Sequence, residues 1–192
     1  RTGDKGKAIA QYKKAIEMNR NDPSPRLALG LVYLDDRIYN FAYHELTAAY
    51  AHIGSLYDNE DKYLLLKSLA TLCFMEAYHS SNPAEMRRKF SREGINYCKE
   101  ALKYKHNSTE VNYLLGDFYY MTPDKKEESD SLAKNAFLRV LEEDPLHFWA
   151  NFKLARLYNS HNNREKALYY INQAVKADPG NEEALELLKK LR

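Results

Sequence analysis

Glycine and proline are scarce in this chain, with 7 and 6 residues among 192. This scarcity argues against a turn-dense β fold, whereas the abundant Tyr, Lys, Glu, Leu and Ala favour long helices. Two cysteines, Cys73 and Cys98, are too few for a disulfide framework and lack CxxC spacing, so we expect buried thiols in a reducing compartment, with a redox pair as the alternative. Since 44% of the residues are hydrophobic, the chain can fill a substantial core, and an all-α fold is predicted.

The chain also lacks an excess of charge of one sign and any long apolar run. Its 29 basic and 27 acidic side chains leave a net charge of +2, far from the basicity typical of nucleic-acid binding. No stretch approaches the roughly 20 apolar residues that span a bilayer, and the first ten residues lack the apolar core of a signal peptide. We therefore expect no nucleic-acid partner and no direct membrane insertion. A cytoplasmic location is favoured, although a start at Arg1 indicates an excised piece whose targeting segment would lie outside it.

Motifs of catalysis and metal binding are missing as well. There is no GxSxG and no glycine-rich phosphate loop, and the six histidines show neither HxxxH nor HExxH spacing. No carboxylate cluster repeats with metal-ligand spacing. We predict a protein that is not an enzyme and that needs no cofactor and no metal.

A leucine followed by a small residue recurs four times, usually with a tyrosine three positions further on. Second helical segments follow, with small or apolar residues at i, i+4 and i+7, as in Ala42, Leu46 and Ala49. Steps of 12 and 22 residues between the small positions add to a period of 34. We expect the small residues of the two helices to face each other, so that the backbones approach closely. The four leucine pairs are Leu29-Gly30, Leu69-Ala70, Leu115-Gly116 and Leu154-Ala155.

This period, clearest over residues 148–181, resembles that of the tetratricopeptide repeat (TPR) family, and the resemblance covers essentially the whole chain. It implies an all-α, right-handed solenoid of antiparallel helix pairs, the TPR superhelix. Asn162 stands where the family usually has a turn glycine, and asparagine tolerates the left-handed conformation. The predicted organisation is one array: 1–22, the second helix of a truncated repeat; 23–56, a repeat; 63–108, a repeat with a long insertion; 109–147, a repeat with a short insertion; 148–181, a repeat; and 182–192, a polar capping helix.

Two insertions lengthen the turns inside repeats. Asn82-Pro83 predicts an early start for one second helix, and Thr122 as N-cap with Pro123 at the first helical position predicts the same for another. We expect both helices to overhang as neighbouring ridges. The basic run Arg87, Arg88 and Lys89 makes the first ridge a secondary candidate site, and a solvated helix face is the alternative.

Solenoids bind partners on a concave face lined mainly by the first helix of each pair. Helical spacing assigns to this face the residues two before, two after and five after each marker leucine, with a tryptophan one turn earlier. Such a lining suits a peptide segment or an amphipathic helix of a partner protein. The alternative is that several of the aromatic residues only pack between helices. The predicted groove consists of Leu27, Leu31, Leu34, Lys67, Thr71, Phe74, Tyr113, Asp117, Tyr120, Trp149, Phe152, Arg156 and Asn159.

The function predicted from these features is a non-catalytic protein-protein interaction scaffold or adaptor within a larger, bacterial-style assembly. One alternative is a structural building block of a pilus, flagellar or organelle-type machine, in which ridges and the convex face drive self-association or docking. Another is an accessory array joined to a catalytic domain elsewhere in a longer protein.

Overall fold

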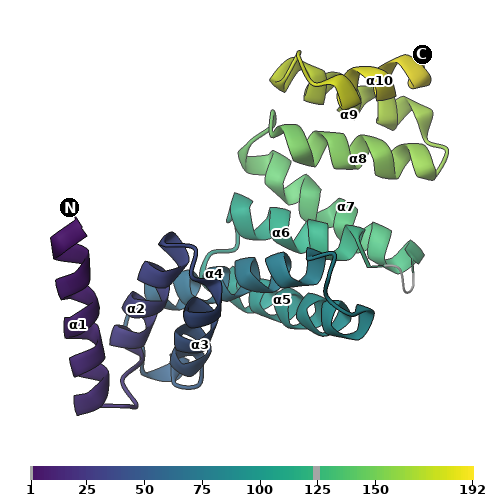
Figure 1. The fold of residues 1–192 in the computed structure, drawn as a ribbon. Coiled ribbons are helices and arrows are strands. Elements are labelled where there is room, and N and C mark those ends of the chain that lie inside the picture. The colour runs from purple at the N-terminus through teal and green to yellow at the C-terminus, as the bar shows by residue number, and fades with distance from the viewer. Residues whose placement is uncertain (1, 123–125) are drawn as a thin grey trace. The chain divides into compact units, whose positions relative to one another are not determined.

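A computed structural model of the chain describes residues 2–122 and 126–192. These residues form ten α-helices and one short 3-10 turn, with no strand in the described ranges, which confirms the predicted all-α fold of antiparallel helix pairs. The helices group into two compact units, Arg1–His106 and Asn107–Arg192 (Figure 1). Each unit is considered by itself.

In the N-terminal unit, a single helix precedes two helix pairs. Helix α1 packs on α2, α2 pairs with α3, and α4 pairs with α5. Asp22 and Asp58 accept hydrogen bonds from the backbone N–H groups of Ser24 and Glu60, which caps α2 and α4. The elements are α1 (Thr2–Met18), α2 (Pro23–Asp35), α3 (Tyr39–Tyr50), η1 (Ile53–Ser55), α4 (Asn59–Tyr78) and α5 (Ala84–Tyr104).

Two further helix pairs and a last helix form the C-terminal unit. Helix α6 pairs with α7 and α8 pairs with α9, while α10 packs on α9. The side chains of Ser108, Asn163 and Asn181 cap α6, α9 and α10, which explains where these helices begin. The elements are α6 (Thr109–Tyr120), α7 (Lys126–Glu143), α8 (Phe148–Ser160), α9 (Arg164–Ala177) and α10 (Glu182–Leu191).

The small residues that follow the four marker leucines are all buried, but two of them face large side chains. A Cβ added at Gly30 would lie 2.6 Å from Leu46 Cγ, and one at Gly116 would lie 2.5 Å from Phe137 Cε1. The expectation that small residues face small residues is therefore wrong at these two positions. Glycine instead leaves room for a leucine or phenylalanine of the second helix to cross the first helix closely.

Left-handed residues end the first helices of two repeats. Asn162 has a φ of 56°, which confirms its predicted conformation, and Arg37 has a φ of 60° in the corresponding turn after α2. The next N–H in each turn, that of Ile38 or Asn163, donates to the carbonyl of the repeat's tyrosine, Tyr33 or Tyr158, at 2.8 and 2.9 Å. Six-residue closures of this type are typical of Schellman C-caps.

The insertions lengthen helices, as predicted. Helix α5 begins at Ala84, well before Gly94, and α7 is helical from Lys126, well before Ala133. The predicted helix start at Pro123 lies outside the described residues. The Thr122 hydroxyl donates to the Phe118 carbonyl at 2.7 Å, which places it against the last turn of α6.

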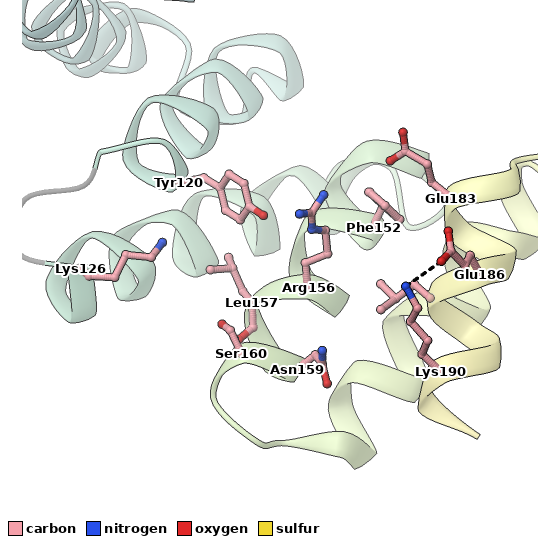
Figure 2. A pocket seen from close by; sticks show the side chains of 11 residues that line it. Tyr120, Lys126, Phe152, Arg156, Leu157, Asn159, Ser160, Glu183, Glu186 and Lys190 are labelled. Carbon is pink, nitrogen blue, oxygen red and sulfur yellow. Dashed lines mark hydrogen bonds and ion pairs between the residues drawn. The ribbon is translucent and has the colours of Figure 1, made fainter. Parts of the chain in front are cut away.

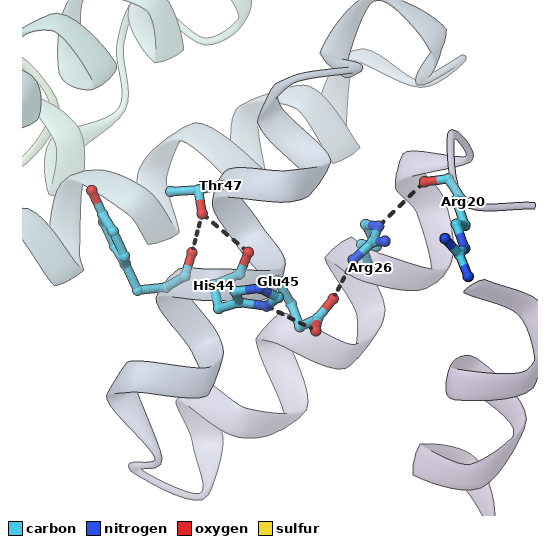
Figure 3. Close-up of polar contacts among 6 residues, drawn as sticks. Arg20, Arg26, His44, Glu45 and Thr47 are labelled. Atoms are coloured by element: carbon cyan, nitrogen blue, oxygen red, sulfur yellow. Dashed lines mark hydrogen bonds and ion pairs between the residues drawn. The ribbon is translucent and has the colours of Figure 1, made fainter. Parts of the chain in front are cut away.

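In two of the repeats, the residue three positions before the marker leucine fixes the turn that precedes the first helix. Arg26 occupies this position in α2, where its Nη1 donates to Glu45 Oε2 at 2.9 Å and its Nε donates to the Arg20 carbonyl at 3.4 Å (Figure 3). Asn151 occupies it in α8, where Nδ2 donates to the Pro145 carbonyl at 3.0 Å. Because the donors reach back to the loop, they hold the start of the next repeat in place.

Candidate functional site

The predicted groove residues of the N-terminal unit lie mostly against its core. Leu27 is only 4% exposed, and Leu31 and Leu34 are half-buried against the same cluster of leucines. The interpretation of Leu27 as a ligand contact is therefore corrected, because its side chain is buried in the core and is not accessible to a ligand. On α4, Lys67, Thr71 and Phe74 are half-buried, and the Phe74 ring lies 4.3 Å from that of Tyr78.

In the C-terminal unit, four predicted groove residues meet at one cavity of about 650 Å³, here named the α8 pocket. Phe152 and Leu157 of α8 are buried and line it with apolar surface, whereas Arg156 and Asn159 are exposed. Figure 2 shows Tyr120 of α6 beside Arg156, with α10 across the pocket. The lining residues are Tyr120, Lys126, Phe152, Arg156, Leu157, Asn159, Ser160, Glu183, Glu186, Leu187 and Lys190.

Trp149 does not line the α8 pocket but lies beside it. Its side chain is 48% exposed, and its ring centroid is 6.1 Å from that of Phe152 at 82°. Phe148 stacks on Phe152 at 5.8 Å and packs edge-on against Trp149 at 4.9 Å. This cluster leaves one indole accessible and holds it in a fixed orientation.

Two other predicted residues, Tyr113 and Asp117, do not line the pocket. Asp117 is 5% exposed and lies 2.9 Å from the ammonium of Lys153. Burial, together with the charge and hydrogen bond of Asp117, raises the pKa of Tyr113, whose ring packs 5.8 Å from that of Phe137. Lys153 also lies 4.7 Å from the centroid of the Tyr120 ring. The interpretation of Asp117 as an orienting charge for a ligand is corrected, because its carboxylate already orients Lys153.

The residues that α10 contributes were not predicted. Glu183, Glu186 and Lys190 line the pocket, yet residues 182–192 were expected to form only a polar cap. They stand five before, two before and two after Leu188, the same offsets that identified Trp149, Phe152 and Arg156 from Leu154. Applied to Leu188, the spacing rule would have found them.

The predicted secondary ridge stays on the surface. Arg87, Arg88 and Lys89 are all exposed near the start of α5, and Lys89 lies 3.8 Å from Glu93. Met86 beside them is 44% exposed. These observations are compatible with a secondary binding site on the ridge and equally with a helix face that is only solvated.

The two thiols are buried, as predicted, in α4 and α5. Burial raises the pKa of Cys73 to about 12 and also raises that of Cys98, so neither is a reactive thiolate at neutral pH. Within the described residues, no three His, Cys, Asp or Glu side chains gather as a metal site would require. The described helices include none that is both long and apolar enough to cross a bilayer.

Stacked antiparallel helix pairs whose first helices present a pocket define a helical-repeat protein of the interaction-scaffold class. Residues 2–36 match the family model described as TPR repeat, and residues 131–182 match that described as tetratricopeptide repeat. These two segments are thus tetratricopeptide repeats, and the fold that such repeats build serves in general as a protein-protein interaction scaffold.

A curated relative carries the same repeat. The tetratricopeptide repeat protein 21 homolog of Caenorhabditis briggsae is 33% identical over 82 residues, which are 43% of this chain and 6% of that protein. The chain therefore spans only a small part of the relative's length.

Solved structures show the same fold at low identity. YrrB, described as a TPR protein with an unusual peptide-binding site, superposes with a TM-score of 0.72 at 23% identity over 98% of this chain and 85% of that one. MamA gives 0.68 at 20% identity over 93% and 91%. PilF of Pseudomonas aeruginosa gives 0.67 at 18% over 94% and 72%. At such identities the likeness concerns the fold alone.

Proposed function

We propose that this chain is a non-catalytic scaffold that holds a short extended segment of a partner protein in the α8 pocket. The observation that carries the proposal is the convergence of Tyr120, Phe152, Arg156 and Asn159, from two different helices, on one cavity of about 650 Å³. Ligand pockets typically enclose roughly 300–1,000 Å³ and combine apolar walls with a few polar groups.

The composition of the pocket supports a peptide as the occupant. Phe152 and Leu157 offer apolar surface, the exposed Asn159 amide can both donate to and accept from a peptide backbone, and Trp149 beside the pocket adds an aromatic anchor. That YrrB is described as having a peptide-binding site is consistent with this proposal.

A peptide phage library panned on the immobilised chain tests the proposal. We expect enriched peptides to bind the wild-type chain and to lose at least about tenfold in affinity with Arg156→Ala/Asn159→Ala, two exposed positions whose truncation should spare the fold. The matched control is Asn135→Ala/Arg139→Ala on the exposed side of α7. If no peptide is enriched, or if both double variants bind equally well, the α8 pocket is not the peptide-binding site.

A second candidate function is assembly through the overhanging start of α5. Its support is the exposure of Met86 beside the exposed Arg87 and Arg88. If this surface drives self-association, Arg87→Glu/Arg88→Glu should shift the mass measured by light scattering toward the monomer. Should the wild-type chain itself be monomeric at high concentration, self-association through the ridge is excluded.

A further inference from the structure

The charges that line the α8 pocket divide into paired and unpaired groups. Lys190 Nζ lies 2.7 Å from Glu186 Oε1, an ion pair within α10, and Lys126 pairs with the carboxylate of Asp130, which is 2% exposed. These four groups already compensate one another. A ligand that engaged them would have to break existing pairs, which reduces the net gain.

Arg156 and Glu183 form no ion pair with any residue in the described ranges. The guanidinium carbon of Arg156 lies 5.8 Å from the centroid of the Phe152 ring, so the side chain leans on an aromatic surface and loses little entropy when it binds. In the view of Figure 2, Phe152 lies between the guanidinium and the Glu183 carboxylate. The pocket thus offers one cation and one anion for a ligand, with an apolar ring between them.

Uniformly charged ligands fit this arrangement poorly. An acidic peptide would place negative charge near the unpaired Glu183, and a basic peptide would place positive charge near the unpaired Arg156. Like charges that meet at an interface repel each other and lower the affinity, so the pocket discriminates against such ligands.

We propose that the α8 pocket selects a peptide of mixed charge: a basic side chain for Glu183, a central apolar side chain over Phe152, and a carboxylate for Arg156. This inference rests on the proposed function and specifies its ligand. The carboxylate and guanidinium can form a bidentate, charge-assisted pair. Asn159, one turn after Arg156 and exposed, is placed to bind the peptide backbone beside that pair.

The test is a bead library of acetylated and amidated hexapeptides, which carry no terminal charges. The library is screened against the full chain, against Arg156→Glu, against Glu183→Lys and against the double reversal. We expect the wild type to enrich peptides with one acidic and one basic residue that flank an apolar one. Each single reversal should weaken binding of a wild-type-selected peptide at least about tenfold. The double reversal should again enrich mixed-charge peptides, with the order of the two charges inverted.

The outcomes separate this inference from the proposed function. Enrichment of peptides without the mixed-charge pattern, or a pattern unchanged by both single reversals, overturns the inference and leaves peptide binding intact. If the wild type enriches no peptide at all, both proposals fail. Circular dichroism and thermal unfolding of each variant establish that lost binding does not come from lost folding, and an Arg139→Glu variant controls for net charge.

Discussion

At the scale of single residues, the left-handed Arg37 is a strained choice for a turn. Residues with a Cβ pay roughly 1–2 kcal/mol in this conformation, and glycine does not. Because glycine also adds entropy to the unfolded chain, we expect Arg37→Gly to raise the free energy of unfolding by only about 0.5–1 kcal/mol in urea denaturation. The control is Lys13→Gly on the exposed side of α1, which should lower it by about 1 kcal/mol. A loss of stability in both variants would contradict the argument.

At Gly116, by contrast, a substitution should destabilise the fold, because an added methyl group would collide with the Phe137 ring. We expect Gly116→Ala to lower the free energy of unfolding by about 1–3 kcal/mol, the usual cost of overpacking. In a Phe137→Leu background, the same substitution should cost about 1 kcal/mol less, since the colliding ring atoms are gone. An equal cost in the two backgrounds would show that the collision is relieved elsewhere.

At the scale of elements, α10 both seals the core and completes the pocket. Leu188 is 8% exposed and belongs to the apolar cluster of α8, α9 and α10, whereas Leu185 on the same helix is 42% exposed. Leu188→Ala should therefore lower the free energy of unfolding by about 2–5 kcal/mol, and Leu185→Ala should change it by less than about 0.5 kcal/mol. Similar effects of the two would mean that α10 does not dock as described.

Besides the apolar contacts of Ile9, Tyr12 and Ile16, an exposed ion pair joins α1 to the end of α2. The Lys5 ammonium donates hydrogen bonds to Asp35 and Asp36 at the end of α2, which lowers the pKa of Asp35. A lowered folded-state pKa contributes stability that is complete above the unfolded value of about 3.9 and is lost as the pH falls through the folded value. We expect an NMR titration to show a depressed pKa for Asp35 that returns to normal in Lys5→Met. An unchanged pKa in that variant would disprove the contact.

The sequence predicted the helix pairs because small residues that recur every 34 residues mark where the two helices of each repeat pack closely. Helical spacing likewise identified Tyr120, Phe152, Arg156 and Asn159, since side chains two before, two after and five after a buried leucine share a face. What spacing could not reveal was which charges neutralise one another. Asp117 is paired because Lys153 of another helix reaches it, and that choice depends on side-chain conformations that no periodicity encodes.

At the scale of the whole molecule, the chain divides into two units, each of which is compact by itself. The first unit ends at His106 and the second begins at Asn107. Repeat arrays derive stability from the repeats and their nearest-neighbour interfaces. A defect in one core should therefore open that unit first.

Two matched core truncations test this separation. Leu46 on α3 and Ile171 on α9 are both fully buried, so Leu46→Ala and Ile171→Ala should each cost about 2–5 kcal/mol. By hydrogen exchange, we expect Leu46→Ala to reduce protection within residues 2–106 and Ile171→Ala to reduce it within residues 107–192. Because every residue of the α8 pocket belongs to the C-terminal unit, peptide affinity should fall only in Ile171→Ala. If both variants lost protection throughout and bound peptide equally poorly, the chain would unfold as one cooperative array, and the pocket would depend on the repeats of the N-terminal unit as well.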